Sequence, residues 1–253
     1  MSDTRRWLKW LRPPVEGATT LLCLHHAGGN AASFLEWAQL LPESITPVAV
    51  QLPGRADRMD EPLLEDMGAL VNALLEALEP LREDPFAVFG SSMGARVGWS
   101  LAHALREREL PLPRALYVYA CAAPSLDRQI RGWNGPDAGL VRYMYKMDGT
   151  PKQLLEDPEL LGYLVAVLRA DLTVLSTHAY QPDVPLDIPV MAFAGRDDEA
   201  SPLGKMAPWA DATRGPFTMH VIEGGHFLGA EGLRQVTRTV AADMLDTAPR
   251  SRG

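Results

Sequence analysis

The sequence predicts an α/β protein in which a mostly parallel central sheet carries helices on both faces. Short apolar runs, typical of buried strands, alternate with longer segments whose apolar residues recur every three to four positions. Several of the apolar runs end in a polar or glycine-rich turn, the place where open α/β sheets build their sites. The 253 residues are 47% hydrophobic and 22% charged, which suits one large domain with a sizeable core.

Two patterns predict the elements of the first half of the chain. Apolar runs predict strands at residues 19–24, 45–52, 86–89 and 114–122. Helical spacing of apolar residues predicts helices at residues 32–41, 63–81 and 93–108. The longest of these helices has an apolar face made of Met67, Leu70, Val71, Leu74, Leu75 and Leu78. Because strands and helices alternate, the strands are expected to pair in parallel, with the helices crossing over between them.

The alternation stops between residues 124 and 187, where no strand-like run occurs. Gly and Pro breaks separate helical patches at 140–147, 151–155 and 159–175. We expect this segment to be a helical insertion, a lid, over the edge of the sheet. Strands resume at 188–194 and 217–222, and a helix at 233–245 follows them. The expected organisation is a core of residues 1–123 and 188–253 with a lid of residues 124–187.

Charge and composition argue against several classes of function. A formal net charge of −8 and a pI near 5.3, without a basic stripe, argue against nucleic-acid binding. No segment approaches the roughly 20 apolar residues that cross a bilayer, and the N-terminus lacks the apolar stretch of a secretory signal. Cys23 and Cys121 lie in strand-like runs and are expected to be buried core residues. The expectation is a cytoplasmic protein that binds neither nucleic acid nor membrane.

The segment Gly90-Ser91-Ser92-Met93-Gly94 follows a predicted strand and begins a predicted helix. A serine at such a tight turn is held above the sheet, and the flanking glycines let neighbouring backbone approach closely. The N-terminus of the helix points free N–H groups at a reacting carbonyl. A glycine–serine turn without chemistry has the same five residues, but the position between strand and helix favours a nucleophile at Ser92.

A nucleophilic serine needs a base and an acid that orients the base, because its hydroxyl is unreactive at its own pKa. The strand at 188–194 ends in Gly195-Arg196-Asp197-Asp198, which places an acid at the carboxyl edge of the sheet. The next strand ends in Glu223-Gly224-Gly225-His226, which brings a histidine to the same edge. This order of serine, acid and histidine accompanies such a turn. The candidates are Ser92, His226 and Asp198, with Asp197 as the alternative acid.

Two backbone N–H groups are the expected oxyanion hole, those of Met93, directly after the nucleophile, and of Ala27. Ala27 lies in the His25-His26-Ala27-Gly28-Gly29 loop, whose glycines allow the backbone to curl over a substrate carbonyl. The competing interpretation is that His25 and His26 bind a metal. Adjacent side chains on an extended segment point apart, and no further cluster completes a site, so neither a metal nor a cofactor is expected.

Several of these segments occur together in one known family. In chain order they are Leu22 to Gly29, Gln51-Leu52-Pro53-Gly54-Arg55, Phe89 to Ala95, Gly195 to Asp198, and Gly224-Gly225-His226-Phe227. With them, from Trp7 to Ala242, the chain resembles the type II thioesterases of polyketide and nonribosomal peptide synthetase pathways. The resemblance implies an α/β-hydrolase fold with a mobile helical lid, a Ser92–Asp198–His226 triad, and oxyanion donors at Ala27 and Met93. The chain departs from the family at Ser91, where histidine is usual, and at His25, where an aromatic or other apolar residue is frequent.

The resemblance also implies a substrate and a partner. These are acyl groups on the 4′-phosphopantetheine arm of acyl or peptidyl carrier proteins, released to clear stalled or misprimed synthetases, and we expect the enzyme to be a monomer. The alternatives are a small-molecule carboxylesterase or lipase with the same triad, and a catalytically silent carrier-protein binder.

Some side chains have two interpretations in the sequence. Candidates for a basic patch that receives the carrier protein, which a solvated surface charge explains more simply, are Arg55, Arg58, Arg142, Lys146 and Arg169. Four residues fit either an acyl channel or lid-to-core packing, namely Tyr143, Met144, Tyr145 and Met147. Asp171 fits either a helix cap or a contact of the lid.

Overall fold

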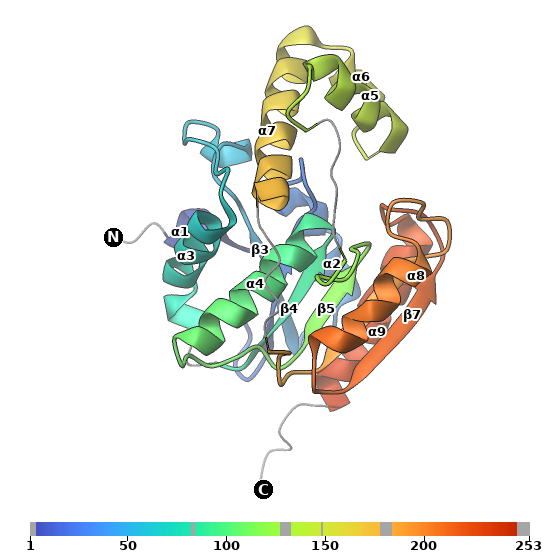
Figure 1. Cartoon of the computed structure of the whole chain (residues 1–253). Helices are drawn as coiled ribbons and strands as arrows, with labels where there is room; N and C mark the ends of the chain where they lie inside the picture. The colour runs from blue at the N-terminus through green and yellow to red at the C-terminus, as the bar shows by residue number, and fades with distance from the viewer. Residues whose placement is uncertain (1–3, 82–83, 127–132, 148, 178–183, 247–253) are drawn as a thin grey trace, which may run out of the picture.

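A computed structural model describes residues 4–81, 84–126, 133–147, 149–177 and 184–246. Among these residues a seven-stranded sheet forms the centre of the molecule, with helices on both of its faces (Figure 1). The strands are β1 (Leu8–Trp10), β2 (Thr19–Leu24), β3 (Ile45–Val50), β4 (Phe86–Ser91), β5 (Leu116–Tyr119), β6 (Val190–Gly195) and β7 (Phe217–Ile222). Their order is β1-β3-β2-β4-β5-β6-β7, and all neighbours are parallel except β1 and β3. The predicted α/β class with a mostly parallel sheet is confirmed.

The helices of the described part of the chain connect the strands and cover the sheet. They are α1 (Thr4–Trp7), α2 (Trp37–Leu40), α3 (Met67–Ala77), α4 (Met93–Glu107), α5 (Asp137–Met147), α6 (Lys152–Leu155), α7 (Pro158–Thr177), α8 (Leu203–Met206) and α9 (Ala230–Asp246). Short 3₁₀ helices are η1 (Ala31–Phe34), η2 (Ala56–Arg58), η3 (Glu79–Leu81) and η4 (Ala207–Ala212). Within the described ranges, no helix has both the length and the apolar character that a bilayer crossing requires.

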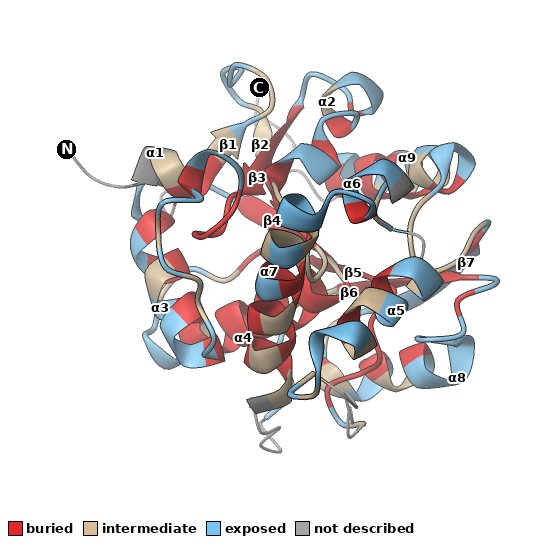
Figure 2. Cartoon of the chain, turned by 90° about the horizontal axis from the view of Figure 1, so that it is seen from above, coloured by how far each residue is buried: buried red, intermediate tan, exposed pale blue. Residues whose placement is uncertain are grey.

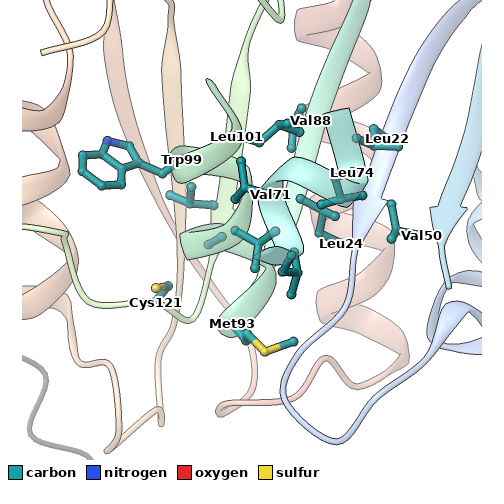
Figure 3. Packing of buried hydrophobic residues seen from close by; sticks show 14 of the residues in the cluster. Leu22, Leu24, Val50, Val71, Leu74, Val88, Met93, Trp99, Leu101 and Cys121 are labelled. Atoms are coloured by element: carbon teal, nitrogen blue, oxygen red, sulfur yellow. The ribbon is translucent and has the colours of Figure 1, made fainter. Parts of the chain in front are cut away.

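Alternate residues of the central strands β2 to β6 supply two hydrophobic cores, one on each face of the sheet. In β2, Leu22 and Leu24 belong to the core that includes residues of α3, α4 and α7, whereas Leu21 and Cys23 belong to the core with α2 and α9. Figure 3 shows the first core, where Val88 of β4 clusters with helix residues such as Leu101. Because successive side chains point to opposite faces, a strand buried on both sides is apolar throughout. This explains why the central strands appear in the sequence as mostly apolar runs.

Capping residues set the helix boundaries more narrowly than apolar spacing does. Helix α3 begins at Met67 because the Asp66 carboxylate accepts the Ala69 N–H at 2.8 Å, so the predicted helix at 63–81 is too long. The predicted helix at 32–41 is divided into η1 and α2. Strand β1, which has three residues, has no signal in the sequence because its pairing with β3 is a long-range contact.

Helices α5, α6 and α7 stand together beyond one end of the sheet (Figure 1). They lie in the segment between β5 and β6 in which no strand was predicted, and α7 contacts both α3 and α4. Viewed from above, buried residues concentrate in the central strands and α4, while α5 and α6 carry many exposed residues (Figure 2). Residues 127–132, 148 and 178–183, which belong to the predicted lid, lie outside the described residues.

Candidate active site

Ser92 occupies the turn between β4 and α4 in a conformation that L residues rarely adopt, with φ 50° and ψ −106°. Its N–H donates to the Tyr119 carbonyl at 2.8 Å, which ties the turn to the neighbouring strand β5. The turn also needs Gly94, since a Cβ at that position would lie 2.1 Å from the Leu24 carbonyl oxygen of β2. The sequence around Ser92 therefore builds the strained strand-to-helix turn that holds a serine side chain above a sheet.

His226 and Asp198 come from the loops after β7 and β6 and meet Ser92 at the carboxyl edge of the sheet. The His226 Nε2 atom lies 3.1 Å from the Ser92 Oγ, and its Nδ1 lies 2.9 Å from the Asp198 Oδ2. Asp197, the alternative acid, is exposed at the surface. The structure thus brings Ser92, His226 and Asp198 into one chain of hydrogen bonds and leaves Asp197 outside it.

The environment of Asp198 determines the direction of that chain of bonds. Burial, the largest single influence, acts to raise the pKa of Asp198, but the His226 contact and the N–H groups of Ser201 and Ala200 outweigh it, and the pKa lies below the usual carboxyl value. As a carboxylate, Asp198 can only accept a hydrogen bond, so the proton of a neutral His226 lies on Nδ1. Nε2 is then free to accept the proton of the Ser92 hydroxyl.

The loop that carries His226 is held by contacts with β5 and β6. The Tyr119 hydroxyl donates to the Gly225 carbonyl at 2.5 Å, directly before His226. Burial, and then the nearby charge of Asp198, raise the pKa of Tyr119, so the phenol keeps its proton and remains a donor. A Cβ at Gly195 would lie 2.3 Å from the same Gly225 oxygen, which shows how closely the two loops approach. Sequence reasoning did not find Tyr119, because its partner lies two strands further along the chain.

The two predicted oxyanion donors lie where α4 meets the end of β2. Met93 is the first residue of α4, so its N–H has no partner within the helix. Ala27 lies in the loop after β2, and the close approach of Gly94 to Leu24 brings this loop to the N-terminus of α4. Among the described residues, neither N–H donates a hydrogen bond to another group of the chain. Both N–H groups are therefore unpaired within the described part of the chain.

Two cavities share His26 and Phe227 in their linings, and the rings of these two residues are in contact, with centroids 4.8 Å apart. The first, of about 200 Å³, lies between residues 26–30 and the helices α5, α6 and α7. Its apolar lining includes Tyr143, Met144, Met147, Leu154, Leu164 and Leu168. The second, of about 650 Å³, lies between residues 32–37 and residues 227–233 and reaches Ser91. Tyr145, the remaining candidate for a channel, is 45% exposed on α5.

Burial corrects the expected basic patch. Arg55 and Arg58 are 3% and 1% exposed, so neither belongs to a surface that receives a partner. Arg58 stacks over Trp7, donates to the Gln51 carbonyl at 2.9 Å and pairs with Glu61. A buried arginine whose partners come from distant segments cannot be distinguished from a solvated arginine by sequence. The exposed positions of the predicted set are Arg142 and Lys146, both on α5.

Asp171 makes a contact of the predicted lid with the core. It is 1% exposed on α7 and pairs with both terminal nitrogens of Arg55 at 2.6 and 2.7 Å. Leu168 and Leu175, one turn before and one turn after Asp171 in the predicted helix, put the acid on an apolar face. This is the signal that predicts a buried partner, because an unpaired buried carboxylate is strongly disfavoured. The sequence does not say which arginine pairs with it.

The chain is similar to known thioesterases in sequence and in structure. The family model described as thioesterase domain matches residues 19–244. The thioesterase PikA5 of Streptomyces venezuelae is 35% identical over 248 residues, covering 97% of this chain and 88% of that protein. The solved RedJ thioesterase of the prodiginine pathway in Streptomyces coelicolor has a TM-score of 0.85 at 29% identity, covering 92% of this chain and 95% of RedJ. The solved type II thioesterase BorB of the borrelidin cluster has a TM-score of 0.83 at 33% identity, covering 97% of this chain and 98% of BorB.

Proposed function

Because the chain belongs to the thioesterase domain family, we propose that it hydrolyses acyl groups from the 4′-phosphopantetheine arm of acyl or peptidyl carrier proteins. The reaction passes through an acyl ester of Ser92. The observation that carries this proposal is the hydrogen-bonded chain from Ser92 through His226 to Asp198. The relatives support the substrate, since BorB is a type II thioesterase of a biosynthetic cluster. We infer that the enzyme clears stalled or misprimed chains from a synthetase.

In the acylation step the Ser92 Oγ attacks the thioester carbonyl while His226 Nε2 takes the hydroxyl proton. Asp198 holds the imidazole in the required tautomer and stabilises the imidazolium that forms. The Ala27 and Met93 N–H groups stabilise the oxyanion of the tetrahedral intermediate, and a donor of this kind contributes about 3–4 kcal/mol. The C–S bond then breaks, and His226 returns the proton to the pantetheine thiolate, which leaves as a thiol.

In the deacylation step a water molecule attacks the acyl ester of Ser92. His226 takes a proton from this water, and the same two N–H groups stabilise the second oxyanion. Collapse of the intermediate releases the carboxylic acid and restores the Ser92 hydroxyl with the proton held by His226. The chemistry uses these side chains, the backbone donors, one water molecule and the arm of the substrate.

The helices α5, α6 and α7 are proposed as the lid of this site, within the segment 124–187. Their apolar side chains and residues 26–30 enclose the cavity of about 200 Å³ next to Ala27. An acyl chain is apolar, so this lining favours it over a polar substituent. Ser92 is 5% exposed, which is consistent with a site that the lid covers between substrates.

We further propose a monomer that acts in the cytoplasm with a carrier protein as its partner. Ser92, His226, Asp198 and both oxyanion donors come from one chain, so the proposed site needs no second copy. Cys23 is buried and unpaired, as is common in a reducing compartment. Light scattering of the purified protein tests the oligomeric state.

The experiment that tests the function compares two substrates in parallel. Carrier proteins loaded with acetyl, propionyl, malonyl and longer acyl groups are incubated with the enzyme, and release is followed by intact mass. Turnover of a p-nitrophenyl ester is measured beside it. We expect faster turnover of the carrier-bound thioesters, and a strong preference for the free ester would favour a carboxylesterase. No release from any carrier protein would overturn the proposed function.

Three variants test the roles within the site. Ser92→Ala is expected to abolish release and labelling by a reactive-serine probe. Asp198→Asn is expected to lower kcat by about 10³–10⁴-fold, because the amide favours the wrong tautomer of His226. Asp197→Asn is the matched control and should retain the wild-type rate. Loss of activity in the Asp197 variant with retention in the Asp198 variant would reverse the assignment of the acid.

A further inference from the structure

A buried ion pair joins helix α7 to the turn that precedes η2. Arg55 donates from Nη1 and Nη2 to the two carboxylate oxygens of Asp171 at 2.6 and 2.7 Å. The side chains are 3% and 1% exposed, so solvent does not screen the pair. The two residues are separated by 116 positions in the sequence, and only the packing of α7 against the core brings them together. The pair is thus a direct connection between the proposed lid and the core.

Both members of the pair also hold the loop that contains Ala27. The Gly28 N–H donates to the Asp171 Oδ2 at 2.7 Å, and Arg55 Nη1 donates to the Gly29 carbonyl at 3.2 Å. Gly28 has a φ of 79°, a conformation in which glycine is the unstrained residue. Two consecutive residues after Ala27 are therefore held by one ion pair.

The direction of the Ala27 N–H follows from the same loop. The His26 carbonyl accepts the Gly29 N–H at 3.0 Å and the His25 Nδ1–H at 2.8 Å. In a trans peptide the carbonyl and the N–H point in opposite directions, so the Ala27 N–H points away from these two donors. A rotation of the backbone at Gly28 would move the Gly29 N–H, one of the two donors that hold this peptide. The orientation of Ala27 thus depends on what holds the two glycines.

A buried ion pair is by itself weak evidence for stability, because apolar residues of similar volume often serve as well. The Arg55–Asp171 pair differs from an apolar contact in that it satisfies two backbone groups of the loop. We propose that Arg55 and Asp171 are positioning residues, which orient the Ala27 N–H only while α7 is docked on the core. Lid position and oxyanion stabilisation are then coupled through this pair. The inference rests on the proposed function, in which Ala27 is an oxyanion donor.

The test uses the full-length enzyme and a double variant, Arg55→Met with Asp171→Leu. This change removes both charges together, so no unpaired buried charge remains to unfold the protein. Asp171→Asn is a second variant, in which the amide oxygen can still accept the Gly28 N–H; it leaves the buried Arg55 charge unpaired, so a loss of stability is expected and is read from its thermal unfolding. The matched control is Asp137→Asn, which breaks the exposed pair of Asp137 with Arg169 in the same group of helices. A thermal unfolding transition is measured for each variant to check that the protein is folded.

Two measurements separate positioning from packing. Acyl-carrier-protein hydrolysis gives kcat and KM, and a pantetheine trifluoromethyl ketone, which forms an oxyanion on the enzyme, gives an affinity for the tetrahedral state. We expect the double variant to lose at least about tenfold in kcat with KM little changed, and its affinity for the ketone to fall by a similar factor. Asp171→Asn is expected to lose less, and Asp137→Asn to behave as the wild type.

A double variant that matches the wild type in kcat and in ketone affinity would overturn the inference while leaving the proposed function intact. A loss confined to KM would also overturn it, since that result assigns the pair to substrate binding. Failure of the wild type itself to release acyl groups would overturn the proposed function and this inference together. The kinetics of the wild type therefore distinguish the two failures.

Discussion

Replacement of Gly94 by alanine tests whether the approach of α4 to β2 sets the geometry of the site. A Cβ at this position would lie 2.1 Å from the Leu24 carbonyl oxygen and 2.5 Å from its carbonyl carbon. Real Cβ contacts are not shorter than 3.0 Å, so α4 and β2 must separate by about 0.9 Å. Both contacts are to backbone, and β2 is held between β3 and β4, so the strand cannot turn aside as a side chain would.

The separation moves Met93 and Ser92, which precede Gly94, away from the loop that carries Ala27. A misplacement of about 1 Å in an active site reduces the rate by about 100-fold. We therefore expect Gly94→Ala to lower kcat by about this factor. Overpacking of this kind also destabilises the fold by about 1–3 kcal/mol, more than the gain of about 1 kcal/mol that alanine brings to a helix.

The assay is the release of free thiol from an acyl-pantetheine thioester, with thermal unfolding measured on the same samples. The matched control is Gly98→Ala in the same helix, where the new Cβ would meet the ends of the Val88 and Leu116 side chains at 2.9 and 3.2 Å. These contacts are to side chains rather than to backbone and are less close than those of Gly94, so the control is expected to keep most of the wild-type kcat. A Gly94 variant with wild-type kcat and stability would refute the reasoning.

Three other predictions concern stability. Gly162→Ala in α7 meets no atom within 4 Å and should stabilise the protein by about 0.4–1 kcal/mol in denaturant titrations, whereas a lower stability would contradict an open site there. Burial, and then the charge of Arg55, lower the pKa of His25, so the unfolded chain takes up a proton below about pH 6.5 while the native protein does not. Stability therefore falls as the pH drops below that value, by up to about 1.4 kcal/mol per pH unit from this group, and His25→Phe should reduce the slope. The pKa of Asp198 is lowered in the native protein, so its ionised carboxylate stabilises the fold above about pH 4, and this stabilisation is lost as the pH falls through the lowered pKa. Asp198→Asn should therefore reduce the loss of stability at acid pH. An acid denaturation curve identical to that of the wild type would contradict this prediction.

Local patterns were sufficient for the elements that carry the site. The turn around Ser92 was predicted because a glycine-flanked serine between an apolar run and a helix has one compatible geometry. His226 was placed at the correct edge of the sheet because parallel strands present their carboxyl ends on one side. Strand β7 has the predicted bounds of 217–222. These features depend on the order of residues within one short segment or one strand.

Sequence patterns were insufficient wherever two distant segments had to meet. Asp198 was preferred to Asp197 in the sequence, but both remained candidates, and the packing of the β6 and β7 loops is what brings the Asp198 carboxylate to His226 while Asp197 is exposed. Arg55 was a candidate for the surface, but in the structure it is paired with Asp171 of α7. The hydrophobic periodicity of neither segment predicts this contact.

The sequence alone determined the class of the fold, the strained serine turn and the chain order of the candidate groups, because periodicity and turn chemistry act within a few residues. The tertiary structure decided which acid faces the histidine, which arginine is buried and how the loop of Ala27 is held. Those outcomes depend on the relative positions of whole helices and strands, which come from the packing of many side chains together rather than from any local pattern.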